Sequence, residues 1–527
     1  MNTPMRVRDV VDGAALVEFP ESSEEAGNRQ AVAMARTLTS APPEGFFAAV
    51  AGAATLLLLF DPRRLPADRL RRRLHDLGRS AAAPATERLL RIPVVYRGLD
   101  LPELARERSI PEQEFARLHA SGNYRVAFLG FAPGFAYLSG LARELAAPRL
   151  PTPRTRVPAG SVAIGGPYTG IYPDETPGGW RLIGRSPVGL FNPRRDPPSL
   201  FQPGDRVRFE PIAQAEFEAL LRLSMTEEGR PGPPAGRPIL RVLAPGLFSS
   251  VQGAPSYRWV SVGVPPGGAM DLTALADGNA ALGNPRGAPG LELTVMGPEL
   301  EALEDLEACL AGAEPSAEID GRAIRFVEPF AWRAGQKLRV GRISRGMRCY
   351  LCVVGGFAAT GRPETTRRVK PDEVLCAPER IARGRPPAFS GARALRVDSG
   401  QMRIRVVLAE PGLFTPESVE SFLSTPYRVS SASDRRGVRL EGSPLAHEKG
   451  ADIAPEGTAP GAIQVPRDGQ PILLGPDRPV TGGYAKVATV IGADLSLVAQ
   501  AAPGAVLRFA AVSLSEALEA RVRMESP

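Results

Sequence analysis

The sequence predicts a mainly β protein with an α+β N-terminal part and a β-barrel domain in each half. The 55 glycines and 54 prolines among 527 residues are spread between short apolar runs, which favours many turns and short strands over long helices. The chain is also longer than a single hydrophobic core usually grows, so two to four domains are expected. The barrels are predicted from an internal similarity between residues 158–209 and residues 460–509.

The two similar segments share one order of motifs. Each starts with a proline–glycine strand ("PAGSVAIGG" and "PGAIQVP") and continues to a threonine and a Gly-Gly-aromatic turn ("TPGGW" and "TGGY"). Each ends with a Pro-Gly turn and an alternating strand ("PGDRVRF" and "PGAVLRF"). Chance similarity in a chain rich in glycine and proline is the alternative. We predict two related β-barrels, with a third, partly similar unit between them.

The expected domains follow from changes in composition and in the spacing of apolar residues along the chain. "EAGNRQAVAMARTL" and "PADRLRRRLHDLG" have the spacing of amphipathic helices beside short strands. "TEEGRPGPPAGRPIL" is charged, rich in Pro and Gly and without an apolar period, which is typical of a linker. We expect an N-terminal α+β domain (1–88), a β-barrel domain (89–225), a linker (226–240), a first β-barrel part of the second half (241–400) and its second barrel part (401–527).

Composition excludes several classes of protein. The formal charge of +7 is small for this length, and no basic block with interleaved aromatic residues indicates nucleic-acid binding. The longest apolar run, "ATLLLLF" at 54–60, is too short to span a bilayer, and the start has no apolar segment of the signal-peptide type. "MRCYLCVVGGF" is typical of a buried strand, on which Cys349 and Cys352 point to opposite faces. We expect a cytoplasmic protein with reduced cysteines that binds neither nucleic acid nor membrane.

Several common chemistries lack their motifs. No "GK" dipeptide is present, so a Walker A loop is excluded, and without "MK" there is no usual site for covalent biotin. No "GxSxG" nucleophile elbow occurs, and His75, His119 and His447 lack the spacing of metal ligands, so no metal site is expected. The first 336 residues contain no lysine. Anion binding in that half therefore falls to arginine, which binds carboxylate or phosphate through paired hydrogen bonds.

Two arginines stand in a pattern that suggests an anion clamp beside backbone amides that Gly160, Gly165 and Gly166 leave uncovered. In "TPRTRVPAGSVAIGG", Arg154 and Arg156 project to the same face of an extended chain, about 7 Å apart. Such guanidinium groups repel each other unless an anion lies between them or a carboxylate pairs with each. The alternative is therefore a pair of surface salt bridges, which would stabilise the fold little.

Other polar residues stand at turns, and each has a structural alternative. Tyr137 in "FLGFAPGFAYLSGL" is either part of a pocket wall or the polar tip of a buried turn. Asp271 follows "VPPGGAM", where capping a helix would by itself explain it. For Asp434 and Arg435 in "SASDRRGVRLEG", a local ion pair is the alternative to ligand binding.

The segment 461–487 adds amides and a rare lysine. Gln464 and Gln470 would orient a polar ligand or simply bond to backbone. Lys486 is one of only four lysines and stands three residues after the Gly-Gly turn, near Asp477. Its rarity makes Lys486 a candidate for chemistry.

These motifs resemble two known families. "YRVAFLGFAPGFAYLSGL", "PRTRVPAGSVAIGG", "TGIYP" and "TPGGWRLIGRSP" resemble the allophanate hydrolase subunit 1 family, which includes the B subunit of 5-oxoprolinase and the Kip-type kinase inhibitor. "PGLFSSVQ", "GVPPGGAMD", "SDRRGVRLEG", "PGAIQVPRDGQPI" and "TGGYAKVATVI" resemble allophanate hydrolase subunit 2, which includes the C subunit of 5-oxoprolinase and the carboxyltransferase domain of urea carboxylase. The chain looks like the B and C subunits of 5-oxoprolinase fused into one polypeptide.

The resemblance implies a cyclophilin-like β-barrel in each half and a part in the ATP-dependent cleavage of 5-oxo-L-proline to glutamate. It implies ATP with Mg²⁺, no covalent biotin on this chain, and a separate 5-oxoprolinase A subunit as partner; a homo-oligomer is left open. Arg154, Arg156 and Lys486 are the residues for which we expect catalytic roles. The substrate site is expected from the following residues: Tyr137, Gly160, Ser161, Gly165, Gly166, Tyr172, Gly178, Gly179, Asp271, Asp434, Arg435, Gln464, Gln470, Asp477, Thr481, Gly482, Gly483 and Tyr484.

The second half departs from its family at several motifs. The usual "VQDxGRPG" is "VQGAPSYR", "PPSGAMD" is "PPGGAMD", "SDRMGYRL" is "SDRRGVRL" and "TGGYPK" is "TGGYAK". These changes leave the exact lactam or amide substrate open. Two other functions remain as alternatives: a Kip-type regulator that binds a sensor histidine kinase, and a carboxyltransferase-like component that receives biotin and a carboxylase from other chains. Fusion fixes a one-to-one ratio of the halves, which favours the enzyme component.

Overall fold

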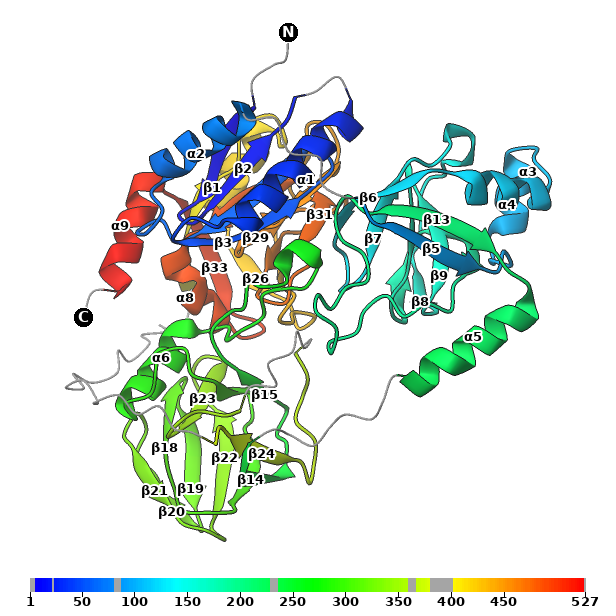
Figure 1. The fold of residues 1–527 in the computed structure, drawn as a ribbon. Helices are drawn as coiled ribbons and strands as arrows, with labels where there is room; N and C mark the ends of the chain where they lie inside the picture. Colours follow the sequence, from blue (N-terminus) through cyan, green and yellow to red (C-terminus); the bar gives the residue numbers. More distant parts are fainter. Residues whose placement is uncertain are drawn as a thin grey trace.

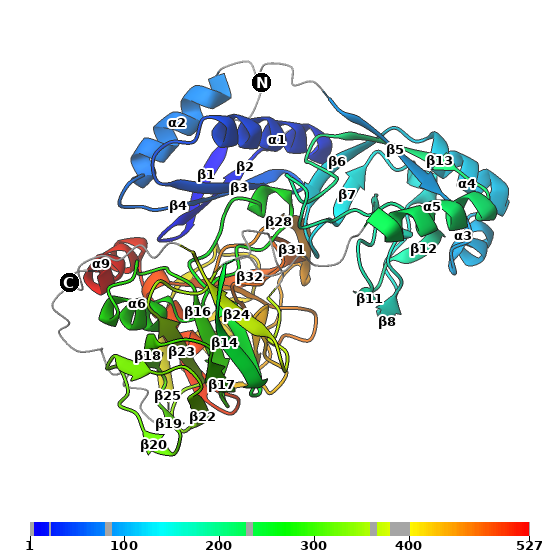
Figure 2. The same cartoon turned by 60° about the horizontal axis from the view of Figure 1, so that its bottom comes forward.

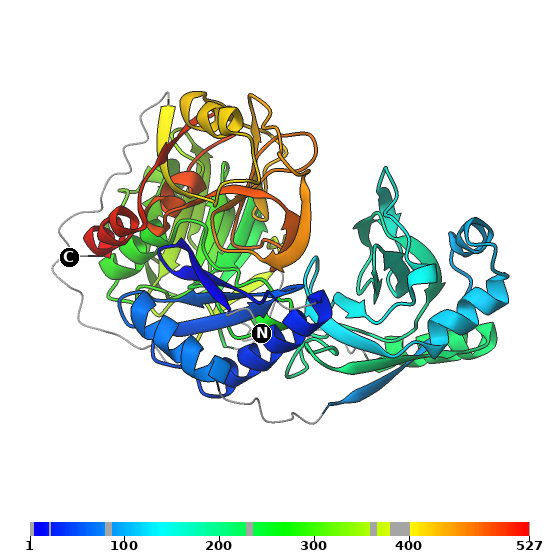
Figure 3. The same ribbon diagram turned by 90° about the horizontal axis from the view of Figure 1, so that it is seen from above.

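The computed structural model describes residues 5–20, 23–79, 87–227, 236–358, 366–379 and 401–525. The chain forms an N-terminal sheet with two helices, a barrel-like sheet, a pair of stacked sheets and a second, closed barrel (Figure 1). Figure 3 shows the first barrel at one end of the molecule and the N-terminal sheet beside the C-terminal barrel at the other. Within the described residues, no helix is long and apolar enough to span a membrane.

The N-terminal unit is a four-stranded sheet in the order β1-β2-β4-β3, and its helices cover one face (Figure 1). Its elements are β1 (Arg6–Val11), β2 (Ala14–Glu18), α1 (Glu24–Ser40), β3 (Phe46–Ala51), β4 (Thr55–Phe60) and α2 (Ala67–Arg79). α1 begins as expected from its sequence, since the side chain of Ser23 accepts a hydrogen bond from the amide of Ala26. β4 is apolar on both faces: Leu56 and Leu58 pack in the core under the helices, whereas Leu57 and Leu59 pack in a separate core on the opposite face.

The first barrel is a seven-stranded sheet in the order β12-β9-β10-β7-β6-β13-β5, in which β5 and β13 run parallel. An isolated bridge between Val95 and Arg185 joins the two ends of this order. Its elements are β5 (Leu89–Val94), α3 (Leu101–Glu107), α4 (Glu112–Ser121), β6 (Tyr124–Leu129), β7 (Ala136–Ser139), η1 (Arg143–Leu145), β8 (Arg154–Val157), β9 (Ser161–Gly165), β10 (Tyr168–Ile171), β11 (Thr176–Gly178), β12 (Arg181–Arg185), β13 (Arg206–Pro211) and α5 (Gln214–Glu227).

The middle unit contains a six-stranded and a five-stranded sheet, with orders β20-β19-β22-β17-β14-β24 and β15-β16-β23-β18-β21. Its elements are β14 (Arg237–Ala244), β15 (Phe248–Gln252), η2 (Val260–Val262), α6 (Leu272–Ala281), β16 (Gly290–Thr294), β17 (Glu299–Ala302), β18 (Leu306–Gly312), β19 (Pro315–Ile319), β20 (Arg322–Ala323), β21 (Phe330–Trp332), β22 (Lys337–Ile343), β23 (Arg348–Val353) and β24 (Val374–Ala377). Cys349 and Cys352 lie on β23 as free buried thiols and pack into two different cores, which confirms the predicted strand. β14 begins at Arg237, within the stretch expected to be a linker, and residues 228–235 of that stretch lie outside the described residues.

The second barrel is closed, with the order β25-β32-β29-β30-β27-β26-β33. Its elements are β25 (Gln401–Leu408), α7 (Pro416–Ser424), β26 (Tyr427–Val429), β27 (Gly437–Glu441), β28 (Asp452–Gly457), β29 (Ala462–Gln464), β30 (Ile472–Leu474), β31 (Thr481–Tyr484), β32 (Lys486–Val490), η3 (Gly492–Asp494), α8 (Leu495–Ala499), β33 (Val506–Ala511) and α9 (Leu514–Glu525). The first barrel has the same strand order in chain sequence, and in both barrels the first and last strands pair in parallel. The predicted barrels in both halves are therefore confirmed.

The N-terminal sheet packs against the second barrel, although the two lie at opposite ends of the sequence (Figures 1 and 2). Two close backbone approaches require glycine: a Cβ at Gly52 would come 2.6 Å from the carbonyl oxygen of Pro455, and one at Gly457 would come 2.4 Å from the Cβ of Leu57. The carboxylate of Asp12 accepts a hydrogen bond from the amide of Gly492 at 2.9 Å. The second half of the chain thus buries the face of the sheet that its own helices leave uncovered.

Candidate functional site at the junction of the two halves

Two of the sequence motifs meet where the first barrel contacts the second. β31 carries "TGGY". It lies on the turn that follows β6, and that turn carries "GFAPGF". The Thr481 hydroxyl donates a hydrogen bond to the carbonyl oxygen of Leu129 at 3.2 Å. Gly130 is so close that a Cβ there would lie 1.5 Å from the Thr481 Oγ1. Only glycine fits at this point of contact between the halves.

Behind this contact lies a cluster of aromatic rings from the first barrel. Tyr137 is stacked on Phe128 with ring centroids 4.5 Å apart, and Phe135 meets both Tyr137 and Tyr172 edge-on. Phe131 is partly exposed and adopts a φ of 65°, a conformation that side chains larger than glycine rarely occupy. The turn is therefore packed by aromatic rings, as one sequence alternative proposed, but it also presents an aromatic ring at the surface.

Arginines influence the tyrosines of this cluster. Burial raises the pKa of Tyr172 to about 12, although the charges of Arg149 and Arg154 act in the opposite direction. Burial likewise raises the pKa of Tyr137, which also feels the charge of Arg149 and lies within electrostatic range of Tyr484 on β31. Side chains from both barrels therefore share one electrostatic environment at the junction.

The two arginines of the expected anion clamp are each paired with a carboxylate. Arg154 Nη2 lies 2.6 Å from Asp100 Oδ1, and Arg156 Nε lies 2.6 Å from Glu175 Oε2. The Arg156 side chain is 76% exposed, so the salt-bridge alternative describes it in this structure. Arg154 differs, because its Nη1 is buried and has no hydrogen-bond partner among the described residues. Of the pair, Arg154 keeps a donor that a ligand would satisfy.

The glycine amides of "PAGSVAIGG" are not uncovered, and this part of the sequence prediction was wrong. Gly160 donates its N–H to the carbonyl oxygen of Tyr172 at 2.8 Å, and Gly166 donates to that of Ala147 at 2.7 Å. Gly165 lies against the indole of Trp180, where a Cβ would come within 2.4 Å of the ring. The small residues are needed so that rings can pack on the strand. A nearby hydroxyl is also used internally: Ser161 donates to the carbonyl oxygen of Pro158 at 2.7 Å.

The second Gly-Gly motif of the first barrel serves the same packing. A Cβ at Gly178 would lie 2.3 Å from the Tyr172 hydroxyl oxygen. The neighbouring Gly179 accepts a hydrogen bond at its carbonyl oxygen from the amide of Leu150 at 2.7 Å. Gly178 therefore leaves the space that the Tyr172 ring occupies.

The structure brings three other predicted residues into one buried ionic cluster. Arg435 forms ion pairs with Asp477 (Nε to Oδ2, 2.8 Å) and with Glu292 (Nη1 to Oε1, 2.6 Å), and its Nη2 donates to the carbonyl oxygen of Gly268 at 2.6 Å. The third, Asp271, donates its amide N–H to the Tyr350 hydroxyl oxygen at 2.8 Å. The alternative of a local ion pair between Asp434 and Arg435 does not hold, because the Arg435 side chain pairs with Asp477 and Glu292 instead.

Hydrogen bonds continue from this cluster across the two units. The Tyr350 hydroxyl donates to Glu292 Oε2 at 2.6 Å. The second carboxylate, Asp271, caps α6 by accepting from the amide of Ala274 at 2.9 Å, which was the structural alternative for this residue, and it also accepts from Gln500 Nε2 at 2.7 Å. The cluster thus connects the middle unit with the second barrel.

The charges of the cluster are balanced by one another. Burial acts to raise the pKa of Glu292, but the positive charges of Arg435 and Arg348 outweigh it and hold that pKa below its ordinary value. The pKa of Asp271 is raised, because burial outweighs the hydrogen bonds that it accepts. Glu292 is fully buried and Arg435 nearly so. Such a sealed, paired cluster fixes the positions of the "VPPGGAMD" and "SDRRG" turns relative to each other.

Lys486 lies in the interface between the second barrel and the N-terminal sheet. Its Nζ is 2.5 Å from Glu456 Oε1, and both side chains are largely buried. They border a cavity of about 50 Å³ that Arg8 and Glu410 also line. Lys486 is therefore held by a carboxylate of its own half, at the interface with the N-terminal sheet.

The remaining predicted polar residues mostly bond to nearby backbone. Asp434 accepts hydrogen bonds from the amides of Arg436 and Gly437, as a turn residue does. Gln470 exchanges two hydrogen bonds with the backbone of Gly442, which was the structural alternative for it.

Gln464 is the exception among these amides. It is buried, and its Nε2 has no hydrogen-bond partner among the described residues. A Cβ at Gly482 would lie 2.5 Å from this Nε2, so Gln464 lies directly against β31, where Gly483 and Tyr484 are half-buried.

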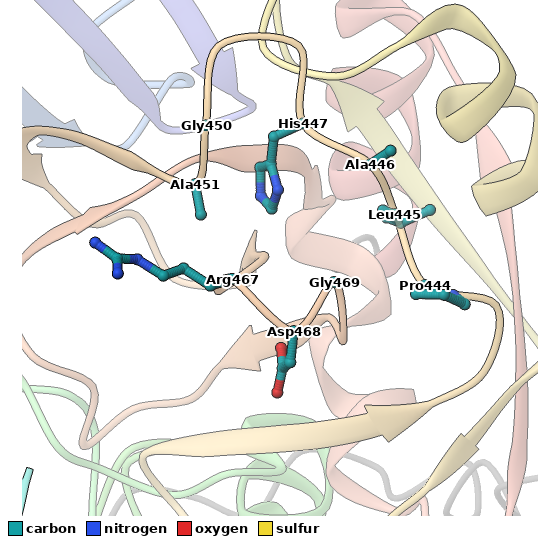
Figure 4. A pocket seen from close by; sticks show the side chains of 9 residues that line it. All are labelled: Pro444, Leu445, Ala446, His447, Gly450, Ala451, Arg467, Asp468 and Gly469. Carbon is teal, nitrogen blue, oxygen red and sulfur yellow. The ribbon is translucent and has the colours of Figure 1, made fainter. Parts of the chain in front are cut away.

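A pocket of about 450 Å³ opens on the second barrel (Figure 4), and its lining residue Ala451 accepts a hydrogen bond at its carbonyl oxygen from the amide of Ala485, which directly follows β31. It lies between residues 444–451 and residues 467–469, and its polar side chains are His447, Arg467 and Asp468. From the sequence, His447 was weighed only as a metal ligand, and no motif indicated this pocket.

Other residues that sequence reasoning missed are Glu292, Arg348 and Tyr350. A signal for them does exist, because Glu292 and Arg348 are charged residues inside the apolar strands "GLELT" and "RCYLCV". A charge in a buried strand requires a partner.

Two family models match the chain. The model of the carboxyltransferase domain, subdomain C and D, matches residues 5–201, and that of subdomain A and B matches residues 262–511. The chain is 34% identical to the B subunit of 5-oxoprolinase from Bacillus subtilis over 234 residues, covering 42% of this chain and 98% of that protein. It is 32% identical to the C subunit of 5-oxoprolinase from Escherichia coli K12 over 292 residues, covering 54% of this chain and 94% of that protein. The crystal structure of the protein TTHA0988 superposes with a TM-score of 0.82 at 35% identity, covering 96% of this chain and 100% of that one.

Proposed function

This chain belongs to the carboxyltransferase-domain family that includes the B and C subunits of 5-oxoprolinase, and we propose that it is a fused B–C component of an ATP-dependent 5-oxoprolinase. The complete enzyme would contain a separate A subunit. It would hydrolyse the lactam of 5-oxo-L-proline to L-glutamate while ATP is hydrolysed to ADP and phosphate.

One observation carries this proposal: each half of the chain matches a different 5-oxoprolinase subunit nearly from end to end, and the halves meet through their own motifs. The contact of Thr481 with Leu129 and Gly130 places "TGGY" of the C-like half on "GFAPGF" of the B-like half. A site at this junction is complete only when both halves are present. This supports a single functional unit better than two independent proteins joined by a linker.

The junction offers groups suited to an anionic substrate. 5-Oxoproline carries a carboxylate, and ATP-driven opening of its ring would pass through a phosphorylated species with further negative charge. Arg154 has a buried and unsatisfied Nη1, and Arg149 acts on the same tyrosines. We assign to Arg154 the stabilisation of this developing charge. Lys486 is held by Glu456, and we assign it to positioning β32.

In the overall reaction the lactam C–N bond breaks, water supplies a hydroxyl to the carbonyl carbon, and the ring nitrogen becomes the amine of glutamate. A second water hydrolyses ATP to ADP and phosphate. ATP and Mg²⁺ are reactants of the whole complex, and we place neither on particular residues of this chain.

A coupled assay tests the proposal. The purified chain is mixed with the cognate 5-oxoprolinase A subunit, ATP, Mg²⁺ and 5-oxo-L-proline, and glutamate and ADP are measured. Both products should form only when both proteins are present. Failure of turnover with a folded and bound partner would contradict the proposal and would point to another lactam or to a Kip-type regulator.

A further inference from the structure

Asp100 immediately precedes α3, at the position where an aspartate ordinarily caps a helix. Its carboxylate does not serve as a cap, because no amide in the first turn of α3, all of which is described, donates to it. Asp100 is nevertheless buried, with 4% of its surface exposed. A buried carboxylate requires partners, and Asp100 finds them on two other elements of the first barrel.

The two carboxylate oxygens of Asp100 hold different groups. Oδ2 accepts a hydrogen bond from the amide of Leu182 on β12 at 2.6 Å, and Oδ1 accepts from Arg154 Nη2 on β8 at 2.6 Å. The backbone ties Asp100 to the same strand, since its own amide donates to the carbonyl oxygen of Leu182 at 2.9 Å. Gly98, in the same turn, lies so close to β12 that a Cβ there would come 2.3 Å from the carbonyl carbon of Ile183. The carboxylate is therefore fixed by β12, and it in turn fixes the guanidinium.

This ion pair differs from another buried pair of the same barrel, Arg88 with Asp205. There, Nε and Nη2 of the arginine donate together to the two oxygens of the aspartate. Within the described part of the chain, Asp100 receives one nitrogen of Arg154, and the other terminal nitrogen, Nη1, is buried without a hydrogen-bond partner. A buried N–H of a charged group that lacks an acceptor is costly, which indicates that this nitrogen is reserved for a ligand.

Arg154 is thereby placed beside Tyr172. Burial raises the pKa of Tyr172 to about 12, against a hydrogen bond from the backbone of Trp180 and the positive charge of Arg154. Trp180 precedes Leu182, the residue that holds Asp100, by two positions. The same short segment therefore sets the position of the tyrosine and, through Asp100, that of the guanidinium.

We propose that Asp100 is a positioning residue, which holds Arg154 by one nitrogen so that Nη1 meets the negative charge developing on a substrate beside Tyr172. This role rests on the proposed function, because it presupposes the charge stabilisation assigned to Arg154. The alternative is a structural carboxylate that only ties α3 to β12. The two roles differ in what the loss of Asp100 does to turnover when Arg154 is already absent.

A double-mutant cycle of Asp100→Asn and Arg154→Ala, measured by steady-state kinetics of the complex with the A subunit, separates the two roles. Asparagine keeps the shape and one oxygen for the amide of Leu182, but its NH2 group then faces the guanidinium, so Arg154 loses its anchor. Alone, Asp100→Asn should lower kcat about 10- to 100-fold and change KM for 5-oxo-L-proline by less than about threefold. In the Arg154→Ala background, it should lower kcat by less than about twofold.

Asp205→Asn is the matched control, because Asp205 is also buried, accepts from the amide of Gln202 at 2.8 Å and pairs with Arg88. It should lower the melting temperature about as much as Asp100→Asn does but leave kcat within about twofold. Asp100→Ser is a second variant for the case that Asp100→Asn does not fold. Serine can cap α3 but is too short to hold the guanidinium, so kcat should fall as in Asp100→Asn.

Loss of kcat by the same factor in the wild-type and Arg154→Ala backgrounds would show a structural role and overturn the assignment. So would a kcat that Asp100→Asn leaves unchanged, or an equal loss of kcat from Asp205→Asn. In each of these cases the wild-type complex turns over, and the proposed function stands. If the wild-type complex forms no glutamate, the proposed function fails, and the positioning role fails with it.

Discussion

Lowering the pH should destabilise the first barrel through His119, which is fully buried on α4. Its Nδ1 lies 2.8 Å from the Tyr96 hydroxyl and its Nε2 lies 2.9 Å from the Thr169 hydroxyl. The Thr169 hydroxyl donates to the carbonyl oxygen of Ala163, so it accepts from Nε2–H, and Nδ1 accepts from Tyr96. Neutral histidine satisfies this chain of hydrogen bonds, and burial lowers the pKa of His119 from 6.5 to about 3.

The sign and size of the effect follow from that pKa. In the unfolded chain His119 binds a proton below its ordinary pKa of about 6.5, whereas in the folded chain it stays neutral until about pH 3. The stability contributed by neutral His119 is therefore fully present above about pH 6.5. It is lost as the pH falls from about 6.5 toward about 3. Each pH unit costs about 1.4 kcal/mol, so at pH 4.5 the loss is roughly 2.7 kcal/mol.

The comparison of wild type with His119→Gln isolates this histidine. Glutamine offers an acceptor to Tyr96 and a donor to Thr169 but does not titrate. The substitution removes the packing of the imidazole ring, which should lower the free energy of unfolding by about 1–2 kcal/mol at pH 7. Peptide-resolved hydrogen exchange of β6 and β13 would give the free energy of opening for both proteins at pH 7 and pH 4.5. At pH 7 the wild type should have the higher free energy of opening, and at pH 4.5 this difference from His119→Gln should shrink or reverse. A difference in free energy of opening that is equal at the two pH values would refute the reasoning.

Three further predictions concern the junction and the ion pairs. Gly130→Ala should separate the halves, because the new Cβ would lie 1.5 Å from Thr481 Oγ1, and it should lower the melting temperature and reduce turnover with the A subunit. Arg435→Ala should destabilise the protein by about 3–5 kcal/mol in urea unfolding, because it removes the nearest cation from the buried carboxylate of Glu292 and from Asp477. Arg154→Ala should cost about 3 kcal/mol, because its carboxylate partner is buried, whereas Arg156→Ala should cost under about 1 kcal/mol.

Each of these predictions has a matched control. Adding Thr481→Ala to Gly130→Ala removes the nearest atom and should restore part of the lost stability; no restoration would show that the contact is not the cause. Arg439→Ala should leave the free energy of unfolding within about 0.5 kcal/mol, and an equal loss there would contradict the account of Arg435. Equal costs for Arg154→Ala and Arg156→Ala would contradict the contrast drawn between their burial.

The barrels could be predicted from the sequence because their signals are local. Proline–glycine turns and alternating strands recur in the same order at 158–209 and 460–509, and the strand orders of the two barrels agree. The helix cap at Asp271 and the buried strand with two cysteines are local as well. Each of these features involves residues that are near neighbours in the chain.

The contacts of the site were harder to predict, because the residues that pair there are far apart in the sequence. Arg435 pairs with Glu292, 143 positions away, rather than with the adjacent Asp434, and no spacing rule indicates that choice. The sequence shows that residues 160 and 166 are glycines without a Cβ. It does not show which carbonyl oxygens accept hydrogen bonds from their amides. Sequence reasoning therefore found residues of the cluster and of the junction without finding the contacts that give them a role.

The most direct test of the central claim is the ratio of glutamate to ADP formed by the full-length chain together with the 5-oxoprolinase A subunit. If the chain supplies both the B and the C functions, the two products should form in equal amounts from 5-oxo-L-proline, with neither protein active alone. ADP formation that is independent of 5-oxo-L-proline, or glutamate formation by the A subunit without this chain, would contradict it.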